Sequence, residues 1–210
     1  MASVGLRDLF AAEATENPDS TLTYAKPVRL AKAIKADISV KPAEATNYAD
    51  DGIDDYESEI IGGEIKLKIN DLTPEAQSFI LGQRRDANGV LIANSKDKPP
   101  LLAVGMRARK TKIKGLYRYL WFRKVKFTPP AESFETRGES INFQNPEITG
   151  KFMPLDNGDW KSDYTAVEDD PVAAAWFDEV YVPVEEPEIE PETGGEPEIE
   201  PETGGEEETP

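Results

Sequence analysis

The stretch that decides the fold reads Ala33-Ile34-Lys35-Ala36-Asp37-Ile38-Ser39-Val40-Lys41, and Glu64-Ile65-Lys66-Leu67-Lys68-Ile69-Asn70 repeats its pattern. Apolar and polar side chains alternate in both segments, which is typical of a β-strand buried on one face. Between them, residues 48–56 (YADDGIDDY) contain four aspartates and a glycine, which favours an exposed loop over a core strand. The sequence therefore predicts a strand pair with one apolar face, one charged face and an acidic loop at its tip.

The charge is distributed unevenly along the 210 residues, of which 38% are hydrophobic. Residues 184–210 contain 12 glutamates and no lysine or arginine, whereas residues 1–183 contain 29 acidic and all 24 basic residues, a net charge near −5. A chain of this length suits one sizeable domain with an appendage or two small domains. The charge distribution favours a domain over residues 1–183 and an acidic tail over residues 184–210.

The tail contains one decapeptide twice, EPEIEPETGG, at residues 186–195 and 196–205. Its glutamates repel one another and it offers almost no apolar surface to bury, so two copies cannot form a repeat fold. We expect the tail to be disordered and to project from the outer surface of any assembly.

Several function classes are excluded or disfavoured by residue types that the chain lacks. It has no cysteine and no histidine, which removes disulfides, thiolate or imidazole metal ligands and a Ser-His-Asp triad. The aspartates at 50, 51, 54 and 55 do not follow the EF-hand spacing, and no glycine-rich phosphate loop or nucleophile elbow is present. The sequence therefore predicts no enzymatic activity, no metal and no cofactor. It also predicts no signal peptide and no membrane-spanning segment.

The remaining elements are predicted from local signals. Thr73 as N-cap, Pro74 at the first helical position and Gly82 as the stop predict a helix over residues 74–81. Asp170-Pro171 predicts the start of a last helix over residues 172–180. Strands are expected at 101–109 and 116–127, joined as a hairpin, and from Glu139 to about Met153, while residues 5–14 fit a strand or a helix. The body is therefore mainly β with one or two short helices.

A strongly basic stretch overlaps the predicted hairpin. Residues 107–126 contain no acidic residue and nine basic ones: Arg107, Arg109, Lys110, Lys112, Lys114, Arg118, Arg123, Lys124 and Lys126. Interleaved aromatic residues would allow this stretch to bind single-stranded nucleic acid, with the rings stacking on bases. The alternation of Tyr117, Tyr119 and Trp121 with Leu120 and Phe122 instead favours a strand packed on both faces, with the rings in the core.

The order of several segments resembles the major tail proteins of long-tailed (siphovirus-type) bacteriophages, over residues 4–183. The segments are VGLRDLF (4–10), PVRLAKAI (27–34), YADDG (48–52), NDL (70–72), GLYRYLWFRKVKF (115–127) and WFDEVY (176–181). The decapeptide tail has no counterpart in the family core.

The resemblance implies a tail tube protein with a β-sandwich or open β-barrel fold and a flanking helix. It implies self-assembly into six-fold rings that stack into the DNA channel of the virion tail. Expected partners are other copies of the chain, the tape measure and tail terminator proteins, and DNA passing without sequence-specific binding. The protein would be made in the host bacterial cytoplasm. If each of six subunits supplied four strands, the barrel would have a backbone diameter of about 50 Å, which leaves room for duplex DNA.

Two groups of candidate site residues follow. The acidic loop is expected to contact another subunit or ring, through Tyr48, Asp50, Asp51, Asp54, Asp55 and Tyr56. The charged face of the strand pair is expected to line the channel, through Lys35, Asp37, Lys41, Glu64, Lys66 and Lys68. Mixed charge on that wall would keep its affinity for phosphate low enough for DNA to slide.

Two alternatives stay open. One is a monomeric nucleic-acid-binding β-barrel that uses residues 107–127. The other is the tube of a phage-derived secretion or bacteriocin particle, which the sequence does not separate from a phage tail.

Overall fold

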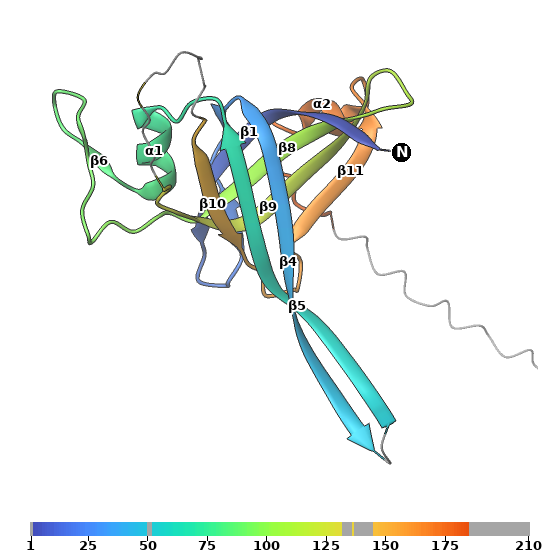
Figure 1. The fold of residues 1–210 in the computed structure, drawn as a ribbon. Helices are drawn as coiled ribbons and strands as arrows, with labels where there is room; N and C mark the ends of the chain where they lie inside the picture. The colour runs from blue at the N-terminus through green and yellow to red at the C-terminus, as the bar shows by residue number, and fades with distance from the viewer. Residues whose placement is uncertain (1, 50–51, 132–135, 137–144, 185–210) are drawn as a thin grey trace, which may run out of the picture.

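The computed structural model describes residues 2–49, 52–131, 136 and 145–184. Within them the chain is mainly β, as predicted, with two short helices (Figure 1). The elements, in chain order, are β1 (Ser3–Glu16), β2 (Leu22–Tyr24), β3 (Val28–Ala31), β4 (Ala33–Ala49), β5 (Gly52–Ile69), α1 (Pro74–Leu81), β6 (Arg84–Arg85), β7 (Leu91–Ile92), β8 (Leu102–Lys110), β9 (Leu116–Thr128), β10 (Glu147–Phe152), β11 (Lys161–Val167) and α2 (Pro171–Ala175).

The main strands pair in one antiparallel series, and the chain connection from β3 to β4 brings its two ends together. The order β1-β8-β9-β10-β5-β4 forms one continuous sheet. Strand β3, which only Lys32 separates from β4, pairs back onto β1. Asn70 stabilises this junction with two hydrogen bonds of 3.0 Å. Its side-chain oxygen accepts from the backbone N–H of Lys32, and its backbone N–H donates to the Lys32 carbonyl. The pairings therefore trace a small barrel-like ring of strands.

The interior of this ring is apolar. Leu67, Phe122 and Ile148 are fully buried there, and α1 adds Ala76 and Ile80 to the same cluster. Helix α1 begins and ends as predicted: the Thr73 hydroxyl accepts a hydrogen bond from the Ala76 amide at 3.2 Å, and Gly82 ends the helix in a left-handed conformation. Local capping signals thus placed this helix correctly.

A second cluster lies on the outer side of β8 and β9. Tyr117, Tyr119 and Trp121 are buried there beneath α2 and the segment that follows it. The Trp121 indole donates to the Trp176 carbonyl at 2.9 Å. Strand β9 is therefore packed on both faces, which confirms the core interpretation of its alternating aromatic residues.

Three expectations need correction or completion. Helix α2 starts at the predicted Asp170 cap but ends at Ala175, because Trp176 and Phe177 leave the helix to pack on the rings of β9. Strand β11 was not predicted, and residues 5–14 form part of β1 rather than a helix. The predicted strand from Glu139 is seen as β10 from Glu147 onward, and residues 137–144 lie outside the described residues.

Neither helix in the described parts of the chain has the length and apolar character that crossing a bilayer requires. The tail from residue 185 onward, with both decapeptides, lies outside the described residues.

Candidate functional site

The longest feature of the molecule is the hairpin of β4 and β5, which extends well beyond the rest of the fold (Figure 1). Its two strands pair from Ala33 and Ile69 to Ala49 and Gly52. The prediction of an acidic loop over residues 48–56 was therefore wrong, because most of these residues belong to the strands. Aspartates are tolerated there since this part of the hairpin buries neither face and has no core to enter.

The hairpin leaves the body at a pair of glycines. Strand β10 ends at Phe152, which pairs with Gly63, and beyond this point β5 pairs with β4 alone. A β-carbon on Gly63 would lie 2.2 Å from the Phe152 ring and 2.2 Å from the Ser39 carbonyl oxygen, so only glycine fits. Gly62 has a φ of 143°, and a bulge falls beside it. We call residues 42–49 and 52–61, distal to these glycines, the arm.

The arm has two different faces, because directly opposed residues on antiparallel strands point to the same side. One face is acidic, with Asp55, Glu57 and Glu59 opposite Asn47, Ala45 and Ala43. The other, the apolar stripe, carries Ile53, Tyr56 and Ile60, which are 68%, 54% and 37% exposed, and the Glu44–Ser58 pair interrupts it between Tyr56 and Ile60. The arm is thus amphipathic although it encloses no core of its own.

The predicted contact residues are distributed over this arm. Asp54, Asp55 and Tyr56 lie on β5, and Tyr48 pairs with Ile53 from β4. Asp50 and Asp51 lie outside the described residues. Residues 42–61 contain seven acidic residues and no basic one. Among the described residues, the arm carboxylates form no ion pair.

The six candidates for a channel wall share one face of the sheet. Lys35 is opposite Lys68, Asp37 is opposite Lys66, and Lys41 and Glu64 point to the same side. The Lys35 ammonium lies 2.6 Å from the Asp37 carboxylate, and the Lys66 ammonium lies 3.6 Å from the Glu64 carboxylate. These pairs are largely exposed and contribute little to stability.

The same face continues onto two strands, β10 and β9, that were not predicted to line the channel. The register places Glu147, Thr149 and Lys151 of β10 beside Lys68, Lys66 and Glu64, and it places Lys126 of β9 beside Lys151. The alternation of these polar residues with Ile148, Gly150 and Phe152 could have revealed them. We call this four-strand surface the lysine face: Lys35, Asp37, Lys41, Glu64, Lys66, Lys68, Lys126, Glu147, Thr149 and Lys151.

The apolar face of the strand pair, on the opposite side from the lysine face, was expected to be buried, and only its β5 half is. Ile65 and Leu67 of β5 are fully buried in the barrel interior. Ile34 and Ile38 of β4, expected in the core, are 48% and 40% exposed. Strand β4 is the last strand of the continuous sheet and pairs only with β5, and Ile34 lies in a bulge.

The cations of the basic stretch differ in their partners. Four over the body are paired: Arg107 with Asp8 and Glu168, Arg118 with Asp163, Arg123 with Asp159 and Lys124 with Glu16. Lys126, which lies on the lysine face, forms no ion pair with any described residue. Hydrogen bonds from Arg118, with a smaller contribution from Lys161, lower the pKa of Asp163 to about 2. Arg109, Lys110, Lys112 and Lys114 lie at or beside the β8–β9 turn and form no ion pair with any described residue. We call residues 109–114 the basic turn.

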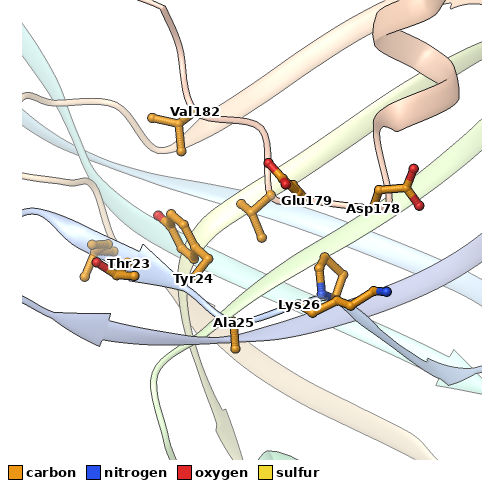
Figure 2. A pocket seen from close by; sticks show the side chains of 10 residues that line it. Thr23, Tyr24, Ala25, Lys26, Asp178, Glu179 and Val182 are labelled. Carbon is orange, nitrogen blue, oxygen red and sulfur yellow. The ribbon is translucent and has the colours of Figure 1, made fainter.

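A hollow of about 690 Å³ lies between residues 22–27 and 178–182 (Figure 2). Tyr24 and Lys26 border it from the β2 side, and Asp178 and Glu179 border it from the C-terminal segment. Burial raises the pKa of Tyr24 to about 12, so its hydroxyl stays protonated. No three carboxylates gather as a metal site within the parts of the chain that the structure describes. The exposed arm and the lysine face remain the strongest candidate surfaces.

Comparison of the sequence with protein-family models found no match, and comparison with curated protein sequences found none either.

Proposed function

We propose that the chain is a structural subunit that assembles with its own copies into stacked rings, forming the tail tube of a long-tailed bacteriophage. The observation that carries the proposal is the arm, a long hairpin that presents an apolar stripe and an acidic face to solvent. Hairpins without a third strand or a packed face are marginally stable in water. The arm is therefore built to be covered by another molecule, and assembly would supply that cover.

The apolar stripe strengthens this argument. Ile53, Tyr56 and Ile60 lie along one face of the arm, with Glu44 and Ser58 between Tyr56 and Ile60, and Ile38 and Val40 extend the same face of β4 toward the body. Exposed apolar surface of this kind is characteristic of protein–protein contacts. Strand β4 also has an open backbone edge along the arm, which a neighbouring chain would protect from uncontrolled pairing.

The lysine face suits the wall of a DNA channel. It is a sheet surface of four adjacent strands, the number used above for a six-fold barrel wide enough for duplex DNA. Its six lysines are interspersed with three carboxylates and a threonine. The neighbouring carboxylates reduce the counterion release that would otherwise hold DNA on the wall. In this proposal the protein is located in the virion tail, where tape measure and tail terminator proteins are its further partners.

The second candidate, a monomeric nucleic-acid-binding protein, has less support. Tyr117, Tyr119, Trp121 and Phe122 are at most 7% exposed, so bases cannot stack on them. Within residues 107–127, the basic turn and Lys126 of the lysine face would remain for contacts to phosphate.

Electron microscopy of the purified full chain tests the proposal. We expect rings or tubes, together with a mixture of oligomers in sedimentation velocity. Small monodisperse particles whose affinity for DNA falls steeply with salt would contradict the proposal and favour the second candidate.

A further inference from the structure

The arm contains negative charge that the rest of the described chain leaves uncompensated. Asp55, Glu57 and Glu59 are all exposed on one face and are opposed by two alanines and an asparagine. No cation lies in residues 42–61 to balance them. Three carboxylates aligned on one strand repel one another and would be stabilised by a basic surface.

The basic turn is the matching surplus of positive charge. Within residues 107–126 four of the five cations over the body have carboxylate partners, whereas Lys126 on the lysine face and the four cations at the turn have none among the described residues. Lys112 and Lys114 are exposed. The turn therefore presents charge that is available to another molecule.

Both surfaces also carry exposed apolar side chains. Ile113, within the basic turn, is 45% exposed, and Val4 of β1 lies nearby, since the neighbouring Ser3 pairs with Lys110. On the arm, Ile53 and Tyr56 lie on the opposite face from Asp55, Glu57 and Glu59. A contact that surrounds the arm on both faces would cover apolar surface in addition to pairing charges.

The two surfaces lie at opposite ends of the molecule. The tip of the arm and the β8–β9 turn are far apart, on either side of the barrel (Figure 1). The arm of a chain therefore cannot fold back onto its own turn. Complementary patches at opposite ends produce a head-to-tail contact, which continues from copy to copy instead of closing as a two-fold dimer.

We propose that the acidic face of the arm docks on the basic turn of a second copy of this chain. The inference rests on the proposed function, because it names the surface on which the arm lands. The docked carboxylates Asp55, Glu57 and Glu59 face Lys110, Lys112 and Lys114 of the next copy. Self-association through this contact weakens as salt rises.

Charge reversal tests the pairing. The arm variant carries Asp55→Lys, Glu57→Lys and Glu59→Lys, and the turn variant carries Lys110→Glu, Lys112→Glu and Lys114→Glu. Each variant alone brings like charges together, so we expect self-association in sedimentation velocity to weaken by more than about tenfold. An equimolar mixture restores opposite charges at every contact, and we expect it to assemble as the wild-type chain does. Circular dichroism checks that both variants fold.

The matched control reverses the charge of Lys96 and Lys98, two exposed lysines outside the basic turn. This variant should assemble normally. Variants that assemble like the wild type, a mixture that stays dispersed, or a wild-type chain that does not self-associate at low salt would each overturn the inference. Tubes that persist in both single variants would leave the proposed function intact. If the mixture regains self-association but no rings or tubes form, the contact is supported and the proposed function is overturned.

Disulfide trapping gives a second readout, which is clean because the natural chain has no cysteine. Glu57→Cys chains mixed with Lys112→Cys chains should form mixed dimers on oxidation. Ser58→Cys chains, whose thiol lies on the other face of the same strand, should form far fewer. Equal yields from the two arm positions would contradict docking through the acidic face.

Discussion

Ion pairs between single residues determine which parts of the basic stretch are free to act. Arg118 of β9 donates its Nε to Asp163 Oδ1 at 2.8 Å, and Lys161 donates to Oδ2 of the same carboxylate at 2.9 Å. This network fastens β11 to β9 and neutralises a cation that the sequence alone offered as a nucleic-acid ligand. The pairing partners were not predictable, because Asp163 and Arg118 are 45 residues apart and meet only through the register of β11.

The pH dependence of stability follows from the pKa of Asp163, which the network lowers from 3.8 to about 2. Ionised Asp163 favours the folded state, so its contribution is fully present above about pH 4 and is lost as the pH falls toward 2. We expect Asp163→Asn to reduce stability at pH 7 by at most about 1 kcal/mol, since the pair is partly exposed. Between pH 4 and 2, the free energy of unfolding measured in urea should also change less with pH in the variant than in the wild type.

Asp156→Asn is the control, because Asp156 forms no ion pair with the described residues. A wild-type chain with the same slope of stability against pH as Asp163→Asn would show that the network does not stabilise the fold.

Among the elements, those with local signals were predictable from the sequence and those defined by distant contacts were not. Helix α1 and the β8–β9 hairpin appear where capping residues and alternation placed them. Strand β11 was missed because only Ser162 and Ala166 of its residues are buried, which leaves a weak alternation. Residues 48–56 of the arm were predicted as a loop because they carry no signal of a core. Their apolar residues do not alternate with a period of two, since a bulge at Asp54 brings Ile53 onto the face of Tyr56.

The arm should be removable without loss of the fold. Replacing residues 42–61 with Asn-Gly joins Lys41 to Gly62, a pair already opposed in the hairpin, through a favoured two-residue turn. Since no described side chain of the arm is buried, we expect the free energy of unfolding to change by less than about 0.5 kcal/mol. Assembly, followed by light scattering, should be lost.

Deletion of residues 186–210 is the comparison, because the acidic tail is expected to be dispensable for assembly. A body that unfolds without its arm, or tubes that form without it, would refute the role assigned to this element.

At the level of the whole molecule, the fold separates its charges. The lysine face occupies one side of the sheet, the acidic arm projects from one end of the barrel, and the basic turn lies at the other end (Figure 1). Sequence alternation predicted which residues of β4 and β5 share the charged face. It did not predict that β10 and β9 extend this face, because strand order is set by long-range pairing.

The central claim is that this chain forms a tube whose wall is the lysine face, and cryo-electron microscopy of its assemblies tests it most directly. The account predicts a channel lined by Lys35, Lys66 and Lys151, with Ile65 and Leu67 inside each subunit and the arm crossing to a neighbouring copy. A reconstruction in which the lysine face points to the outside of the tube, or in which the chain remains a monomer with its arm uncovered, would contradict it.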